Sequence, residues 1–199
     1  MIQRVAAFFL VALVMVGCTT TQPPMKEYTI TLKPAKSFAK GSCKKYDLKV
    51  SQVFVGSSLM SKSMKYRVGE YAEYAYNRSQ WSEDPNKALT QAIVANLQET
   101  GIFKSVSDYR SFSKSDYTLE SRVDRFVQGY SSDEKHSFAA VDLTFQLIEN
   151  ATARVVATKH ITKEERLSVV GAAAGVAGLN RLFSEALSEM DQWIDGSCK

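Results

Sequence analysis

Histidine is scarce in this sequence: only His136 and His160 occur among 199 residues, and neither has a second ligand at the spacing of a metal motif. The chain also has no HExxH, no paired CxxC, no GxSxG and no GxxxxGK[ST]. These absences exclude the common zinc sites, the serine hydrolase elbow and the nucleotide-binding P-loop. Carboxylates alternate with basic residues, as on solvated strand surfaces. We therefore expect no enzyme, no metal and no cofactor.

Long apolar runs are also missing. The longest is residues 5–16, twelve residues without a charge, whereas a membrane-spanning helix needs about 20. The charge is nearly balanced, with 25 basic and 21 acidic residues and a formal net charge of +4. Because the basic residues are scattered and form no strip, we expect no nucleic-acid partner.

The amino terminus resembles the signal peptide of a bacterial lipoprotein. Arg4 supplies a positive charge, the apolar run follows, and Met15-Val16-Gly17-Cys18 stands where the run ends. This sequence resembles a lipobox, which needs an apolar residue three positions before the cysteine and a small residue directly before it. We expect cleavage of residues 1–17 and double acylation of Cys18, which anchors far more stably than one chain. The alternatives are an uncleaved anchor helix and an ordinary secretory signal.

The residues after Cys18 predict a tether and a location. Threonine, glutamine and proline dominate residues 19–24, and such a composition cannot bury a core. We interpret residues 18–27 as a lipidated flexible tether and residues 28–199 as one periplasmic domain. Thr19 stands where an aspartate retains lipoproteins in the inner membrane of enteric bacteria. We therefore expect the periplasmic face of the outer membrane.

Two further cysteines, Cys43 and Cys198, remain in the mature chain. In an oxidising compartment such a pair can form a disulfide. A bridge here would close nearly the whole domain and stabilise it by about 5 kcal/mol on the chain-entropy model. Free thiols in mobile segments are the alternative, and the sequence leaves both open because it does not show how near the two Cα atoms lie.

Two helices are expected from capping signals and apolar stripes. Asp84-Pro85 is a helix start and Gly101 a helix stop, so a helix should cover residues 85–100 with Leu89, Ile93 and Leu97 on one face. A second helix should cover residues 176–194. Its apolar face should consist of Leu179, Phe183, Ala186, Leu187, Met190 and Ile194.

Strands are expected on both sides of the first helix. Alternating apolar residues predict them at residues 28–32, 46–50, 64–68 and 70–77, and again at 117–127, 141–147 and 154–161. A turn at residues 149–152 should join the last two as a hairpin, and a phase change near Arg125 indicates a bulge. We predict a single α/β domain whose mixed, largely antiparallel sheet carries two long helices.

A glycine and alanine stretch and a group of tyrosines have two interpretations each. Residues 171–178 read GAAAGVAG, and we interpret them as a flexible lead-in to the last helix. The alternative is a site where lipid or a partner backbone approaches closely. Tyr66, Tyr71, Tyr74 and Tyr76 lie within eleven residues, and cross-strand packing is the simpler explanation. They could also line a site for acyl chains or a partner, and Tyr71, Tyr74 and Tyr76 are our candidate contact residues.

Over most of its mature length the sequence resembles the ABC-type transport auxiliary lipoproteins, the PqiC-like proteins. The most telling segment is 74–85, a tyrosine-rich strand followed by Trp81 and by Pro85 before a helix. Both residues have a structural explanation, as an anchor and a helix start. Further resemblance lies at residues 28–30, 64–68, 97–106, 117–126 and 176–194.

The resemblance implies a function that the residues alone do not show. Such lipoproteins are accessory components of MCE-type lipid transport systems, in which a separate ABC permease and ATPase act in the inner membrane. This chain would dock the periplasmic MCE protein at the outer membrane, with phospholipid as a further possible partner and a homo-oligomeric ring as a possible form. A structural or assembly lipoprotein is the competing hypothesis, and an envelope hydrolase a weaker one.

Overall fold

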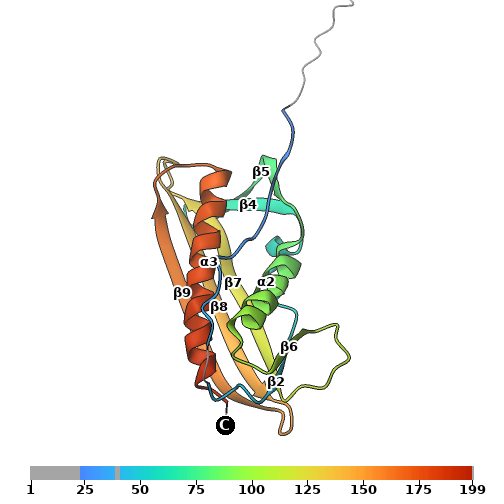
Figure 1. Ribbon diagram of the computed structural model, residues 1–199. Coiled ribbons are helices and arrows are strands. Elements are labelled where there is room, and N and C mark those ends of the chain that lie inside the picture. The colour runs from blue at the N-terminus through green and yellow to red at the C-terminus, as the bar shows by residue number, and fades with distance from the viewer. Residues whose placement is uncertain (1–22, 39–40, 199) are drawn as a thin grey trace, which may run out of the picture.

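The computed structural model describes residues 23–38 and 41–198 (Figure 1). The predicted signal peptide and Cys18 lie outside the described residues. The elements follow one another as β1 (Lys26–Tyr28), β2 (Asp47–Val50), β3 (Phe54–Val55), the helical turn η1 (Ser57–Leu59), β4 (Ser63–Val68), β5 (Ala72–Trp81), α2 (Pro85–Thr100), β6 (Ser105–Asp108), β7 (Tyr117–Tyr130), β8 (Ser137–Glu149), β9 (Arg154–Leu167) and α3 (Ala172–Asp195).

The sheet is organised around β7, which has different neighbours on its two edges. Along one edge β7 pairs antiparallel with β8 over the full length of the strand, and β8 pairs antiparallel with β9. Along the other edge it pairs with three short parallel strands in turn, β2, β3 and β4. β6 lies beyond β2, and β5 and β1 lie beyond β4. The prediction of a single domain with a mixed sheet and two helices is confirmed, and its longest ladders are antiparallel.

The long strands follow the sequence pattern closely. The register of β7 against β8 shifts between Val123 and Arg125, so the predicted bulge lies within a residue of its expected place. The predicted hairpin is also present, and β9 continues to Leu167, six residues further than expected. The helix α2 starts at Pro85 and stops at Gly101, whose φ of 64° is left-handed and therefore suits glycine.

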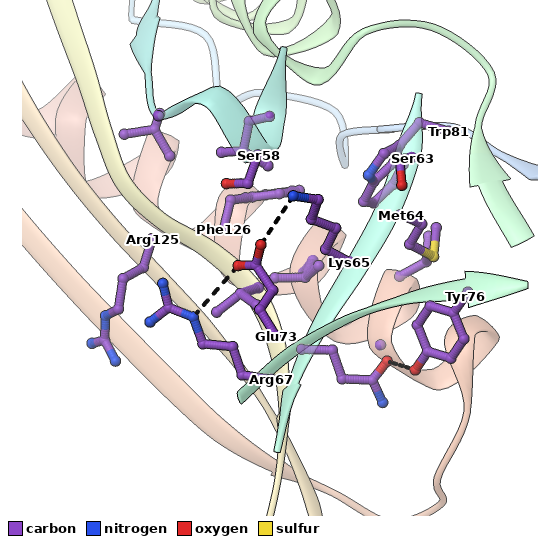
Figure 2. Close-up of a pocket in the computed structure, with 18 of the residues that line it drawn as sticks. Ser58, Ser63, Met64, Lys65, Arg67, Glu73, Tyr76, Trp81, Arg125 and Phe126 are labelled. Atoms are coloured by element: carbon purple, nitrogen blue, oxygen red, sulfur yellow. Dashed lines mark hydrogen bonds and ion pairs between the residues drawn. The ribbon is translucent and has the colours of Figure 1, made fainter. Parts of the chain in front are cut away.

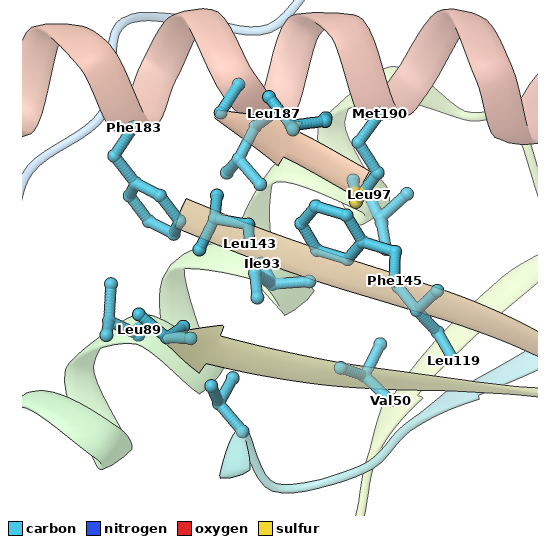
Figure 3. Packing of buried hydrophobic residues seen from close by; sticks show 14 of the residues in the cluster. Val50, Leu89, Ile93, Leu97, Leu119, Leu143, Phe145, Phe183, Leu187 and Met190 are labelled. Carbon is cyan, nitrogen blue, oxygen red and sulfur yellow. The ribbon is translucent and has the colours of Figure 1, made fainter. Parts of the chain in front are cut away.

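The hydrophobic core lies between one face of the sheet and the two helices (Figure 3). Alternate residues of β8 point into it, among them Leu143 and Phe145. Phe183, Leu187 and Met190 meet them from α3, and the predicted stripe Leu89, Ile93, Leu97 meets them from α2. Each of these side chains is at most 1% exposed, and burial of one large apolar side chain stabilises a fold by about 1.5–3 kcal/mol.

The glycine and alanine stretch is helical, so the predicted flexible lead-in is wrong. The helix α3 begins at Ala172 and includes Gly175 and Gly178. A β-carbon at Gly178 would lie 2.9 Å from that of Ala139, and one at Gly175 would lie 2.0 Å from Oε1 of Gln128. The glycines therefore let the first turns of α3 lie directly on the sheet, and this close packing offsets their low helix propensity.

The first predicted strand is shorter than expected. Only residues 26–28 pair, parallel to β5, and residues 29–32 leave the sheet although they alternate. The side-chain amide of Asn180 on α3 donates to the carbonyl of Thr29 (3.2 Å) and to the hydroxyl of Thr31 (3.1 Å). This segment is therefore held by helix α3 instead of by a neighbouring strand.

Candidate functional site

Cys43 and Cys198 are joined by a disulfide, and their Cα atoms lie 5.1 Å apart. Both residues are buried. Beside the bridge the backbone N–H and the hydroxyl of Ser42 donate to the carbonyl of Asp195, at 3.3 and 2.7 Å. The bridge therefore ties the segment before β2 to the end of α3.

The candidate tyrosines divide into a packed group and an exposed one. The ring of Tyr66 is the centre of the group, 4.6 Å from that of Tyr76, 5.7 Å from that of Tyr74 and 5.3 Å from that of Tyr130. Tyr71, at the tip of the β4–β5 hairpin, is 90% exposed and Tyr74 is 52% exposed. Cross-strand packing accounts for Tyr66 and Tyr76, whereas Tyr71 and half of Tyr74 remain on the surface.

The hydroxyl of Tyr76 belongs to a hydrogen-bond network that connects β5, β7 and α3. It donates to Oε1 of Gln128 (2.8 Å) and accepts from the hydroxyl of Tyr130 (2.6 Å). The Tyr130 hydroxyl in turn accepts from the backbone N–H of Gly171 (3.0 Å). Burial, helped by the Tyr130 hydrogen bond, raises the pKa of Tyr76 far above its ordinary value. Tyr76 therefore stays neutral and holds the start of α3 in place.

A slot opens in the sheet where β4 separates from β7 (Figure 2). Its apolar wall includes Met64, Trp81 and Phe126. Its polar side carries an ion-pair cluster. The carboxylate of Glu73 lies 3.0 Å from Nζ of Lys65 and 3.8 Å from Nε of Arg67. The separation of the two strands and the bulge in β7 create this opening, because the ladder between β4 and β7 starts only at Tyr66.

The slot is too small for a lipid. Its volume is about 60 Å³, whereas pockets for small molecules measure about 300–1,000 Å³. The two cations of the cluster are partly neutralised by the one carboxylate that they share.

In the part of the chain that the structure describes, no group of three His, Cys, Asp or Glu side chains gathers at a distance suited to a metal ion. His136 and His160 lie apart at the exposed surface. Neither described helix combines the length and the apolar character that crossing a membrane requires.

Comparison with known proteins places this arrangement in a family. The model of the ABC-type transport auxiliary lipoprotein component matches residues 28–191, which is nearly the whole domain. The chain belongs to this family. The matched region runs from β1 almost to the end of α3, so the family pattern describes the fold as a whole and singles out no one site. A lipoprotein family indicates the cell envelope as the location of this auxiliary lipoprotein.

Solved structures share the fold of the auxiliary lipoprotein. A protein of Xanthomonas campestris is 20% identical with a TM-score of 0.75, and the match covers 85% of this chain and 95% of that one. The crystal structure of an uncharacterized protein is 17% identical with a TM-score of 0.66, covering 86% of this chain and 99% of that one. At these identities the likeness shows the fold alone. No curated protein matches the sequence.

Proposed function

We propose that this auxiliary lipoprotein is a non-catalytic, lipid-anchored component of an MCE-type ABC lipid transport system at the outer membrane. The family match over residues 28–191 is the observation that carries the proposal. In this role the domain docks the periplasmic MCE protein and, through it, works with the ABC permease and ATPase. Self-association into a ring is part of the same hypothesis.

The absence of a nucleotide-binding motif supports the proposal that docking and ATP hydrolysis belong to separate chains. The sequence has no P-loop, so ATP hydrolysis would belong to another chain. The sequence also has none of the common hydrolase or metal motifs. In this proposal the domain supplies surfaces for binding, and turnover belongs to other chains.

The proposed anchor is Cys18, on the basis of the lipobox alone. The expected tether, residues 18–27, would keep the domain near the membrane surface, which suits a receiver for a partner that crosses the periplasm.

Affinity purification of the full-length protein from cross-linked membranes, read by mass spectrometry, tests this function. We expect an MCE-family protein and an ABC permease to be recovered with the wild type and to be depleted with Cys18→Ser. Deletion of the gene should also increase envelope permeability. If no transport component is recovered and the permeability barrier of the deletion strain is intact, the structural lipoprotein becomes the better explanation.

A further inference from the structure

Three connections of the fold meet at one end of the molecule. The register pairs Val68 with Tyr130, Tyr130 with Ser137, and Ser137 with Leu167. The connections that follow or precede these residues are therefore neighbours. They are the β4–β5 tip (69–71), the β7–β8 turn (131–136) and the β9–α3 connection (168–171). We call these three segments the loop end.

Four exposed apolar side chains lie at or beside the loop end. Tyr71 is 90% exposed, Val169 62%, Val170 56% and Tyr74, on β5 just after the tip, 52%. These four are among ten large apolar side chains exposed in the described residues. They occupy one region because Tyr74 stacks on Tyr66, which contacts Tyr130, whose hydroxyl binds the backbone of Gly171, next to Val170. A grouped apolar surface of this kind marks an interaction site.

Charged residues at the same end do not favour one sign. Lys135 and Arg166 line a shallow hollow together with Val169 and Val170. The turns of the loop end also carry three acidic residues, whose negative charge offsets that of these cations: Glu70, Asp133 and Glu134. The apolar side chains, rather than a net charge, therefore determine what this end contacts.

The amino terminus leaves the domain at this end as well. The strand β1 runs parallel to β5, so the residues before it point back toward the β4–β5 tip. In Figure 1 the first described residues leave at the top, the end at which β4, β5 and the start of α3 lie. From Lys26, the first residue paired in the sheet, back to Cys18 is eight residues, which span at most about 29 Å when fully extended.

We infer that the loop end lies against the phospholipid surface that holds the lipid anchor. This inference rests on the acylation of Cys18 given under the proposed function. Tyr71 then sits at the headgroup level, where tyrosine is favoured at membrane interfaces. Val169 and Val170 face the acyl boundary. The far end, with the β8–β9 turn at residues 150–153 and the loop at residues 109–116, points into the periplasm.

The inference can be tested on the intact acylated protein in vesicles of phosphatidylethanolamine and phosphatidylglycerol that contain a headgroup-level nitroxide lipid. Tyr71→Trp and Val169→Trp place a fluorescent reporter at the loop end. Phe112→Trp is the matched control, since Phe112 is a fully exposed aromatic residue that lines a hollow with Asn150 at the far end. The unsubstituted protein supplies the background of Trp81 and Trp193.

We expect the nitroxide lipid to quench the two loop-end reporters several-fold more than the Phe112→Trp reporter, with little dependence on salt. Equal quenching at both ends of an acylated, vesicle-bound protein would overturn the orientation and leave the anchor standing. A mature chain without acyl chains, seen by mass spectrometry, would overturn the anchor and the inference together. Shielding of Tyr71→Trp from a soluble quencher only when a protein partner is added would assign this surface to that partner instead.

Discussion

The two edges of β7 are built in opposite ways. On one edge a continuous hairpin, β8 with β9, follows β7 along its whole length. On the other edge three separate strands of two to six residues pair with β7. Long antiparallel strands specify their own pairing because many neighbouring residues share one register. Short parallel strands lack that support, so contacts from elsewhere must hold them.

Beside the strand ladders with β7, three side-chain contacts that can be tested singly join the patchwork half (residues 26–108) to the hairpin half (β7, β8, β9 and α3). They are the Cys43–Cys198 bridge, a buried hydrogen bond from Asn96 on α2 to Asp191 on α3, and the bond between Tyr76 and Tyr130. A substitution at each of these contacts should change the free energy of unfolding by a different amount.

Loss of the disulfide should have the largest effect. We expect the double variant Cys43→Ser, Cys198→Ser to lower the free energy of unfolding by about 5 kcal/mol, because the bridge closes a loop with a sequence separation of 155 residues. Guanidinium unfolding of the oxidised wild type and of the double variant measures this difference in the free energy of unfolding. A reductant should destabilise the wild type equally and leave the double variant unchanged. An unchanged unfolding midpoint in the double variant would mean that the patchwork half is held without the bridge.

Asp191→Asn should stabilise the protein in a pH-dependent manner. Burial raises the pKa of Asp191 to about 6 from 3.8, against the opposing hydrogen bond from Asn96. Because the unfolded carboxyl ionises first, the folded state loses stability as the pH rises from about 4 to about 6. At pH 7.5 the variant should be more stable by about 1–3 kcal/mol, and near pH 4 it should match the wild type. Urea unfolding at both pH values measures the difference.

The exposed Glu185 on the same helix is the matched control for Asp191. Glu185→Gln should change stability little at either pH, since the side chain is in contact with water. A similar gain for both variants at pH 7.5 would point to the overall charge of the helix and away from the burial of Asp191.

Tyr76→Phe should have the smallest effect, a loss of about 1 kcal/mol. The substitution keeps the ring contact with Tyr66 but removes the hydroxyl that bonds Gln128 and Tyr130. Thermal unfolding compares it with Tyr71→Phe, whose exposed hydroxyl should contribute almost nothing. Equal stability of the two variants would show that the hydroxyl network does not fasten β5 to β7.

The helix α2 and the β8–β9 hairpin were the most predictable parts of the fold. Alternation along residues 141–147 and the apolar stripe of α2 report local periodicity, which the sequence shows directly. Gly101 likewise marks its helix end because few other residues accept a positive φ there. These features depend on neighbours within a turn or a strand.

The remaining features depend on contacts far apart in the sequence. Gly175 and Gly178 look like helix breakers until β7 is placed beneath the first and β8 and β9 beneath the second. Tyr76 resembles an exposed strand residue, yet its partners are 52 and 54 positions away. The pairing of three short strands with β7 leaves no local signal either. For the candidate site, the tyrosine positions were identifiable, but their division into packed and exposed members needed the fold.

The strand β9 bears on how the protein avoids unwanted association. Within the described residues it borders the sheet, since its ladder partner is β8 alone. Its charged side chains point partly toward α3, where Lys159 and Lys163 bind Glu189 and Glu165 binds Arg181. A foreign strand joining this edge would have to pack beside these charges and desolvate them. The long outer border of the sheet thus resists the edge-to-edge addition of strands from other copies of the chain.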